Sequence, residues 1–263
     1  MSKLRLKDFE DADPLDRGDY DARLVTLQHR LELIQAAYIA RRLRAIVAIE
    51  GWDASGKGGL IKRMTATTDP RFTKIWSIGA PTDVEHGEHY LERFWRKLPD
   101  RREWAVFDRT WYGRVLVERV DKLTPKKAWR RAYDEINAFE ATQIDDGARI
   151  VKLFLHTSQK EQDRRLRDRL ECPWKRWKTG ADDYHNRALR AEYHAAYEDM
   201  FDRTSTKAAP WTVIAADDKR AARIAGLEAV VAGLGAGVDL TYAPVDPDLR
   251  AMAEQALTVK LRL

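Results

Sequence analysis

The segment AIVAIEGWDASGK, residues 45–57, carries the strongest structural signal in the sequence. Residues 45–49 are all apolar and three of them are β-branched, which is typical of a buried strand. Gly51 to Lys57 then fits the pattern G-x-x-x-x-G-K, and a helix is predicted to begin near Lys57. This order favours a phosphate-binding loop, because the backbone N–H groups of the turn and the positive end of the helix face the same anion.

One departure from the usual phosphate loop concerns the metal. Gly58 follows Lys57, at the position where nucleoside triphosphatases usually place the Ser or Thr that binds Mg²⁺. Mg²⁺ must therefore find other oxygen ligands, and Asp53 within the loop is the obvious candidate. Lys57 supplies a full charge that can follow a transferred phosphoryl group. The alternative is a glycine-rich turn without a ligand, which the coincidence of lysine, strand and aspartate disfavours.

A second carboxylate ends another apolar run. Residues 104–108 read WAVFD, which is a Walker B pattern: an apolar strand followed by an aspartate. In an open parallel sheet the carboxyl ends of the strands border the ligand crevice, so Asp108 is predicted to face the phosphate loop. Together with Asp53 it offers the hard oxygen ligands that Mg²⁺ prefers. The alternative role for Asp108 is to cap the next helix.

Strands and helices are predicted to alternate along the chain. Besides residues 45–49, strands are expected at 74–79, 104–108, 149–155 and 211–215. Helices are expected at 20–43, 57–68, 84–97, 126–146, 158–170, 184–203 and 218–233. This pattern predicts an α/β fold in which a parallel sheet has helices on both faces. We divide the chain into an N-terminal arm (1–19), a P-loop domain (20–233) and a C-terminal appendage (234–263), which we interpret as an oligomer contact.

Composition narrows the class of protein. The 263 residues include 47 Lys and Arg against 42 Asp and Glu, and this surplus suits an anionic partner such as a nucleotide, polyphosphate or nucleic acid. No apolar run approaches the roughly 18 residues of a membrane-spanning helix. The single cysteine, Cys172, excludes a disulfide framework within the chain. The N-terminus lacks the apolar core of a secretory signal, so a cytoplasmic location is expected.

A basic segment at about 160–185 is predicted to form a lid. Arg165 and Arg169 lie four residues apart, on one face of a predicted helix that Pro173 ends. The segment continues with cations interleaved with tryptophans, namely Lys175, Arg176 and Lys178. A mobile cationic segment opposite a phosphate loop can neutralise transition-state charge and exclude water. The alternatives are a solvated helix face or a surface for single-stranded nucleic acid.

Taken together, these motifs resemble the type 2 polyphosphate kinase family. The resemblance lies in residues 50–59, 61–63, 80–82, 94–99, 107–114, 161–162, 173–178 and 209–213. They occur in order across roughly residues 20–232, which disfavours chance similarity. The resemblance implies a thymidylate-kinase-like P-loop fold with a helical lid, and it implies polyphosphate and Mg²⁺ as ligands.

The resemblance also implies roles for individual residues. Asp53 and Asp108 are expected to hold the metal and to orient the attacking nucleotide phosphate. Lys57 and Arg109 are expected to contact the transferring phosphoryl group, and Arg169 to close over it. The other expected phosphate-binding residues are Gly51, Ser55, Gly56, Gly58, Gly59, Lys62, Arg63, Arg114, Lys175, Arg176 and Lys178.

The implied reaction moves a phosphoryl group between inorganic polyphosphate and a nucleotide. Trp52 and residues 110–120 and 133–137 resemble the subgroup that converts AMP to ADP, whereas relatives that act on diphosphates more often carry Asn at the position of Gly113. That subgroup commonly has two fused kinase domains and this chain has room for one, so AMP and ADP both stay open as acceptors. We expect an adenine nucleotide, with guanine as the second option, and a homo-oligomer with a candidate contact at 20–43, but no nucleic-acid or membrane partner.

Two other functions fit parts of the sequence. An ATP-dependent nucleoside monophosphate kinase has the same phosphate loop and differs in its donor. A non-catalytic polyphosphate- or nucleic-acid-binding protein needs the basic segment, but it does not need Asp53, Lys57 and Asp108 together.

Overall fold

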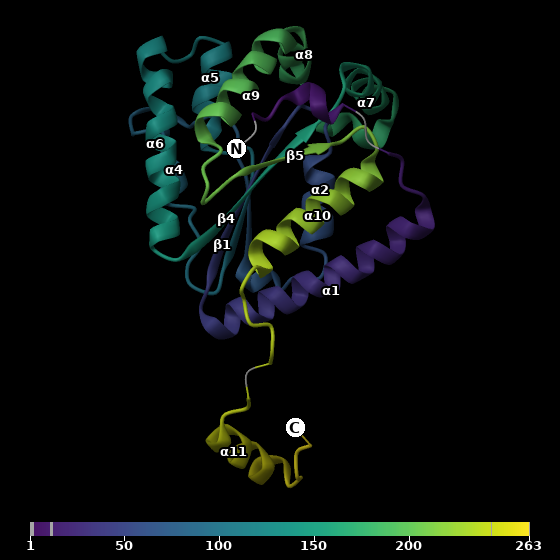
Figure 1. Ribbon diagram of the computed structural model, residues 1–263, viewed down its shortest axis with the longest axis vertical. Coiled ribbons are helices and arrows are strands. Elements are labelled where there is room, and N and C mark those ends of the chain that lie inside the picture. The colour runs from purple at the N-terminus through teal and green to yellow at the C-terminus, as the bar shows by residue number, and fades with distance from the viewer. Residues whose placement is uncertain (1–2, 11–12, 243, 263) are drawn as a thin grey trace.

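A five-stranded parallel sheet lies at the centre of the protein (Figure 1). The computed structural model describes residues 3–10, 13–242 and 244–262. The strand order is β2-β3-β1-β4-β5. The strands are β1 (Arg44–Gly51), β2 (Thr73–Ser77), β3 (Trp104–Asp108), β4 (Ala148–His156) and β5 (Trp211–Ala215).

The central strand β1 is apolar because the sheet is covered on both faces. Ala45, Val47 and Ile49 belong to one buried cluster, and Ile46 and Ala48 belong to the other. Successive side chains of a strand point to opposite faces, so a strand buried on both sides needs a continuous apolar run. The run that predicted this strand therefore reflects its place in the middle of the sheet.

Helices cover both faces, which confirms the predicted α/β fold. The face of Val47 is covered by α1 (Arg17–Arg41), α2 (Lys57–Met64) and α10 (Lys219–Gly235). Figure 1 shows α1 and α10 running side by side over the sheet. The opposite face is covered by α6 (Lys126–Asp145), α9 (Arg190–Thr204) and the 3-10 helix η3 (Trp111–Val115).

The remaining elements are shorter or lie outside these layers. The predicted lid consists of α7 (Gln159–Glu171), η4 (Pro173–Lys178) and α8 (Ala181–Ala188). The predicted C-terminal appendage contains α11 (Pro247–Leu257), which projects from the body in Figure 1. Among the described residues, no helix combines the length and the apolar character needed to cross a bilayer. The other short helices are η1 (Leu6–Phe9), η2 (Pro70–Phe72), α3 (Asp83–His86), α4 (Glu92–Trp95) and α5 (Val117–Val120).

Two predicted helices are wrong as single elements. The range 84–97 contains two one-turn helices, α3 and α4, because α3 ends at Gly87, whose N–H closes on the carbonyl of Val84. The range 184–203 is divided between α8 and α9 at Leu189, whose backbone leaves the helical region (φ −96°, ψ 28°). Helical periodicity continues through both breaks, so the apolar pattern alone did not reveal them.

Two helix boundaries also differ from the prediction. Helix α1 begins at Arg17, inside the predicted arm, because the Asp16 side chain accepts hydrogen bonds from the first free N–H groups. Helix α2 ends at Met64, and the threonines that follow are poor helix formers. The arm also contains the 3-10 helix η1, whose Leu6 is fully buried in the core.

The register of the sheet brings the predicted site residues to one edge. Ile49 of β1 lies opposite Asp108 of β3, and Gly51 lies opposite Leu155 of β4. Neighbouring parallel strands therefore end together. The loop after β1 and the carboxylate that ends β3 meet at the carboxyl edge, where α/β folds bind ligands.

Candidate active site

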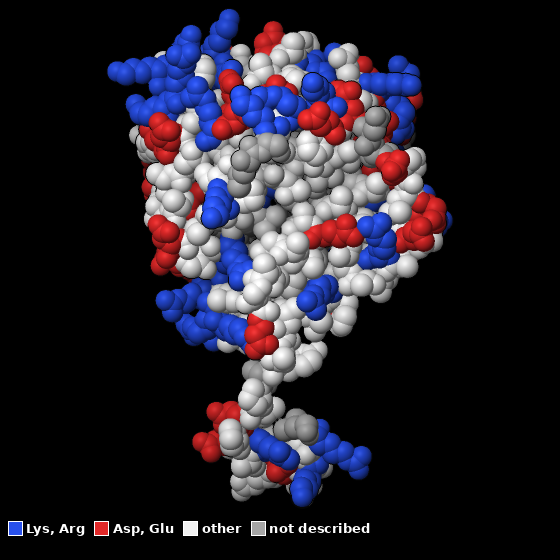
Figure 2. All heavy atoms as spheres, in the orientation of Figure 1, with Lys and Arg blue, Asp and Glu red and all other residues white. Residues whose placement is uncertain are grey.

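A cleft of about 760 Å³ opens at this carboxyl edge. It is bounded by the loop after β1, the end of β3, the lid and the start of α10. Ten of its lining residues are Lys or Arg and four are Asp, so its wall is strongly cationic. Figure 2 shows Lys and Arg side chains across the end of the molecule that carries α5, α6 and the lid in Figure 1, with acidic groups among them.

The phosphate loop has the backbone that its glycines require. Gly51 has φ +147°, and a Cβ at this position would lie 2.5 Å from the carbonyl oxygen of Leu155 on β4. The loop continues through Gly56 at φ +114° into α2, which begins at Lys57. The Ser55 hydroxyl is buried without a hydrogen-bond partner among the described residues, which suits a phosphate oxygen.

The ammonium group of Lys57 is bound to its own loop. Its Nζ donates to the carbonyl oxygens of Gly51 at 2.8 Å and Trp52 at 3.1 Å. These carbonyl acceptors are neutral, whereas a phosphate oxygen carries negative charge and attracts the ammonium group more strongly. Lys57 can therefore exchange them for an incoming phosphoryl group.

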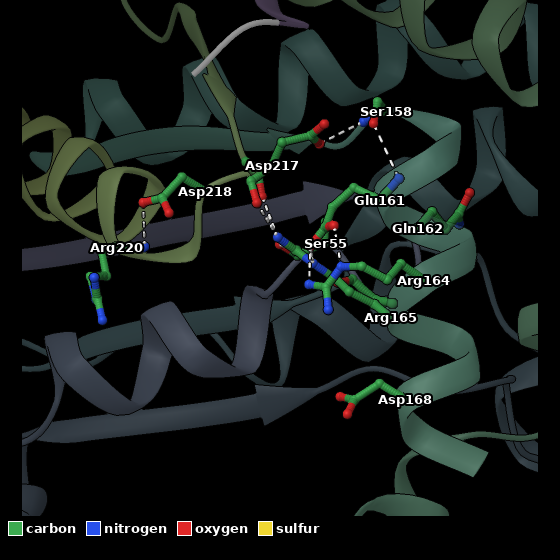
Figure 3. A network of polar contacts seen from close by, with 12 residues as sticks. Ser55, Ser158, Glu161, Gln162, Arg164, Arg165, Asp168, Asp217, Asp218 and Arg220 are labelled. Atoms are coloured by element: carbon green, nitrogen blue, oxygen red, sulfur yellow. Dashed lines mark hydrogen bonds and ion pairs between the residues drawn. The ribbon is translucent and has the colours of Figure 1, made fainter. Parts of the chain in front are cut away.

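Arg165 of α7 holds the phosphate loop from the outside (Figure 3). Its Nη1 donates to the carbonyl oxygens of Ala54 at 3.1 Å and Ser55 at 2.7 Å. Its Nη2 donates to two carbonyl oxygens after β5, and its Nε pairs with Glu161 at 2.6 Å. Burial lowers the pKa of Arg165, although the Glu161 carboxylate opposes this shift. Arg165 thus braces the loop and is not a free lid cation.

Asp53 lies at the mouth of the loop between two donors. Arg109 donates from Nη2 to Oδ1 at 3.0 Å, and Asn186 donates from Nδ2 to Oδ2 at 2.8 Å. Burial favours a higher pKa for Asp53, but the charges of Lys57 and Arg109 outweigh it, and the pKa lies below the usual value. Asp53 is therefore ionised at neutral pH.

Asp108 presents a second carboxylate to the cleft. Its side chain is half-buried and makes no hydrogen bond or ion pair with another described residue. In the part of the chain that the structure describes, no group of three or more His, Cys, Asp or Glu could hold a metal ion. The unpaired Asp108 and the ionised Asp53 fit a magnesium ion that takes its remaining ligands from water and phosphate, as Mg²⁺ commonly does.

Glu50 ties the phosphate loop to the loop that follows Asp108. Its carboxylate accepts hydrogen bonds from the backbone N–H of Thr110 at 2.8 Å and from the Thr110 hydroxyl at 2.7 Å. Burial raises the pKa of Glu50, although the Thr110 contact opposes this shift. Arg109 directly precedes the anchored Thr110 and has a left-handed backbone (φ 65°). Its guanidinium contacts Asp53.

The structure brings most of the expected phosphate-binding residues to the cleft. Arg169 also lines it, with its Nη1 bound to the Lys178 carbonyl at 2.9 Å and to Asp183 at 3.3 Å. The others in the lining are Ser55, Gly56, Gly58, Gly59, Lys62, Arg63, Lys175 and Lys178, while Gly51 lies behind them at the end of β1.

Two expected phosphate-binding residues lie elsewhere. Arg114 pairs with Glu118 at 2.6 Å and stacks on Tyr90 at 4.3 Å, because η3 carries it away from the phosphate loop. Arg176 is exposed on η4, and its Nε donates to the carbonyl of Leu170. Neither residue lines the cleft.

Sequence reasoning missed two cations that do line the cleft. Lys219 and Arg223 lie one turn apart at the start of α10. The guanidinium of Arg223 lies 3.5 Å from where a Cβ of Gly59 would be. No motif surrounds them, so their place becomes visible only when α10 packs beside α2.

A buried histidine supports the loop from behind. His156 accepts a hydrogen bond at Nδ1 from the indole N–H of Trp52 at 2.8 Å. Arg190 stacks on the Trp52 ring at 3.9 Å. Burial, reinforced by the charge of Arg190, lowers the pKa of His156 to about 4. The neutral imidazole is the form that can accept from Trp52, since a protonated ring has two donors.

The stability of the protein is expected to fall as the pH drops from 6.5 towards 4 because His156 must stay neutral. The pKa of His156 is 6.5 in the unfolded chain and about 4 in the folded protein, so the neutral imidazole stabilises the fold fully above pH 6.5. This stabilisation is lost as the pH falls towards the folded-state pKa of about 4. The loss amounts to about 3 kcal/mol. Urea unfolding at several pH values, with wild type compared to His156→Asn, measures it.

The variant keeps a side-chain acceptor near the Nδ1 position but does not titrate. Its free energy of unfolding should therefore fall less steeply over this pH range. His29→Asn, which changes an exposed histidine on α1, should retain the steep wild-type dependence. An unchanged slope in His156→Asn would contradict the assignment.

Comparison with known proteins gives consistent matches. Residues 14–236 match the family model described as polyphosphate kinase 2 (PPK2). The chain is 44% identical to a polyphosphate:AMP phosphotransferase of Pseudomonas syringae, covering 82% of this chain and 43% of that protein. It is 37% identical to an AMP/ADP-polyphosphate phosphotransferase of Meiothermus ruber, covering 82% of each.

A solved structure agrees with these matches. The crystal structure of polyphosphate kinase 2 from Arthrobacter aurescens superposes with a TM-score of 0.84 at 30% identity and covers 97% of both chains. The chain spans less than half the length of the Pseudomonas syringae relative. The family match covers most of the chain and includes the phosphate loop, Asp108 and the lid. The chain therefore belongs to the polyphosphate kinase 2 (PPK2) family.

Proposed function

We propose that the chain is a phosphotransferase that moves a phosphoryl group between inorganic polyphosphate and a nucleotide. The observation that carries this proposal is the wall of the cleft. Ten Lys or Arg residues line it, and they extend from the phosphate loop along the lid and α10. A long polyanion can use such an extended wall, whereas the phosphates of one nucleotide reach only part of it.

AMP is the acceptor that we propose, with ADP as product. The names of relatives support this choice, since a polyphosphate:AMP phosphotransferase is 44% identical. An ADP-polyphosphate phosphotransferase of Rhizobium meliloti is 37% identical, so conversion of ADP to ATP is the alternative. We also propose that the protein works in the cytoplasm as a homo-oligomer, with α1 as a candidate contact.

Positioning and positive charge supply most of the acceleration in the proposed mechanism. Lys57 leaves its carbonyl partners and follows the phosphoryl group during in-line transfer. Arg109 places one guanidinium edge on Asp53 and the rest in the cleft. Arg169 closes from the lid over the same group. Mg²⁺, when held by Asp53 and Asp108, neutralises the charge of the phosphate oxygens.

The test is product analysis after incubation of the purified protein with long-chain polyphosphate and Mg²⁺. AMP and ADP are supplied separately, and ATP replaces polyphosphate in a parallel reaction. ADP formed from AMP supports the proposal in full, while product only from ADP reverses the choice of acceptor. Transfer from ATP alone would leave an ordinary nucleotide kinase, and no turnover with any donor would leave a binding protein.

A further inference from the structure

Asn186 of the lid helix α8 contacts the phosphate loop without carrying a charge. Its Nδ2 donates to Oδ2 of Asp53 at 2.8 Å, and its Oδ1 accepts from the Tyr193 hydroxyl at 3.1 Å. Tyr193 is 5% exposed and belongs to α9. Because an amide accepts only through its oxygen, the Tyr193 contact fixes which end of Asn186 faces Asp53.

The Asp53 carboxylate is fixed from two sides. Arg109, which follows β3, donates to Oδ1, and Asn186 donates to Oδ2. Each carboxylate oxygen has two lone pairs, so one acceptor position on each oxygen stays open, and Asp53 lines the cleft. The two donors therefore fix the plane of the carboxylate, and both of its oxygens can still bind a metal ion.

Helix α8 has a separate attachment to the rest of the lid. Arg187, the next residue, pairs with Asp163 of α7, with an Nη2–Oδ2 distance of 2.8 Å. Asn186 thus contacts the phosphate loop, while its neighbour contacts the lid helix. Two further contacts hold α8, namely Asp183 with Arg169 at 3.3 Å and His185 with Asp121 at 3.0 Å. The Asn186 and Arg187 contacts can still be removed one at a time, which separates a role at Asp53 from a role in holding α8 in place.

We infer that Asn186 is a positioning residue that makes the orientation of Asp53 depend on the lid. The phosphate loop supplies the carboxylate, and the docked lid supplies the hydrogen bond that orients it. Asp53 is then fully oriented only while α8 lies against the loop. This inference rests on the proposed role of Asp53 in phosphoryl transfer and concerns no group that touches substrate. Partners that orient metal ligands in this way typically change affinity or activity by 10–100-fold.

The experiment compares Asn186→Ala with Arg187→Gln in the full-length protein. Three quantities are measured: the affinity for Mn²⁺ alone, from the loss of the free-ion EPR signal, and kcat and KM at saturating Mg²⁺. Asn186→Ala should weaken Mn²⁺ binding or lower kcat by about tenfold or more, with KM for polyphosphate unchanged. Arg187→Gln should leave both Mn²⁺ affinity and kcat within about twofold of wild type.

Tyr193→Phe provides a graded intermediate. It keeps Asn186 but removes the hydroxyl that orients the amide, so its loss should be smaller than that of Asn186→Ala. Circular dichroism establishes that each variant is folded. Equal losses in Asn186→Ala and Arg187→Gln would overturn the inference, since they would indicate lid docking alone. No saturable Mn²⁺ binding by the wild type would also overturn it. Failure of polyphosphate as donor, with the Mn²⁺ ranking intact, would reject only the proposed function.

Discussion

Asp108→Asn is expected to lower kcat by about 10²–10³-fold, the range found when one electrostatic contact to a transition state is removed. Asparagine keeps the shape of the side chain and removes its charge. The carboxylate faces the cleft without a partner among the described residues, so the fold does not depend on it. KM for polyphosphate should stay within about threefold, because the cationic wall that binds the polymer is intact.

Steady-state kinetics with polyphosphate and AMP, at Mg²⁺ concentrations that saturate the wild type, give both constants. Asp100→Asn is the matched control, because Asp100 is exposed in the loop that precedes β3, at the opposite edge of the sheet. Its kcat should equal that of the wild type. Survival of activity in Asp108→Asn would show that the proposed metal site is wrong.

The local part of the site was predictable from sequence. The phosphate loop needs glycines, a lysine and a flanking strand within one short segment, so the whole signal is contiguous. Asp108 could be placed opposite the loop because parallel strands end at a common edge, and the register of Ile49 with Asp108 bears this out. The alternation of strands and helices predicted a parallel sheet covered by helices, because this order is also visible along the chain.

The contacts that hold the loop could not be predicted, because they depend on how distant elements pack. Arg165 and Arg169 lie on one predicted helical face and both line the cleft, yet Arg165 donates to the loop backbone whereas Arg169 donates to the Lys178 carbonyl within the lid. Lys219 lies in the cleft only because α10 packs beside α2. Asn186 carries no charge and belongs to no motif that we recognised, so only its distance to Asp53 reveals it.

The sequence pattern also did not reveal the role of Lys152, a lysine inside a buried strand. It lies in β4 with no exposed side-chain surface, and burial lowers its pKa. Its Nζ donates to Glu140 at 2.8 Å and to the Thr204 carbonyl at 2.7 Å. Glu140 in turn accepts from Tyr112 and from Trp111 of η3, the helix that closely follows Asp108.

Lys152→Met should therefore lower the free energy of unfolding by about 3–5 kcal/mol, because it leaves Glu140 buried and unpaired. The double variant Lys152→Met/Glu140→Gln should recover most of this loss, since a neutral amide oxygen can still accept from η3 and needs no counter-charge. Urea unfolding of the single and double variants measures both effects.

Lys74→Met is the matched control for Lys152→Met. Lys74 also lies on a strand and pairs with a carboxylate, Glu103, at 3.5 Å, but its side chain is 44% exposed. Removing a solvent-exposed pair of this kind should cost no more than about 1 kcal/mol. Two results would contradict the view that the Lys152–Glu140 pair holds η3 in place. One is a similarly small loss in Lys152→Met, and the other is a double variant no more stable than the single one. The anchoring of η3 would then rest on aromatic packing, in which Trp111 contacts Phe107 and Phe139 at centroid distances of 5.5 and 5.0 Å.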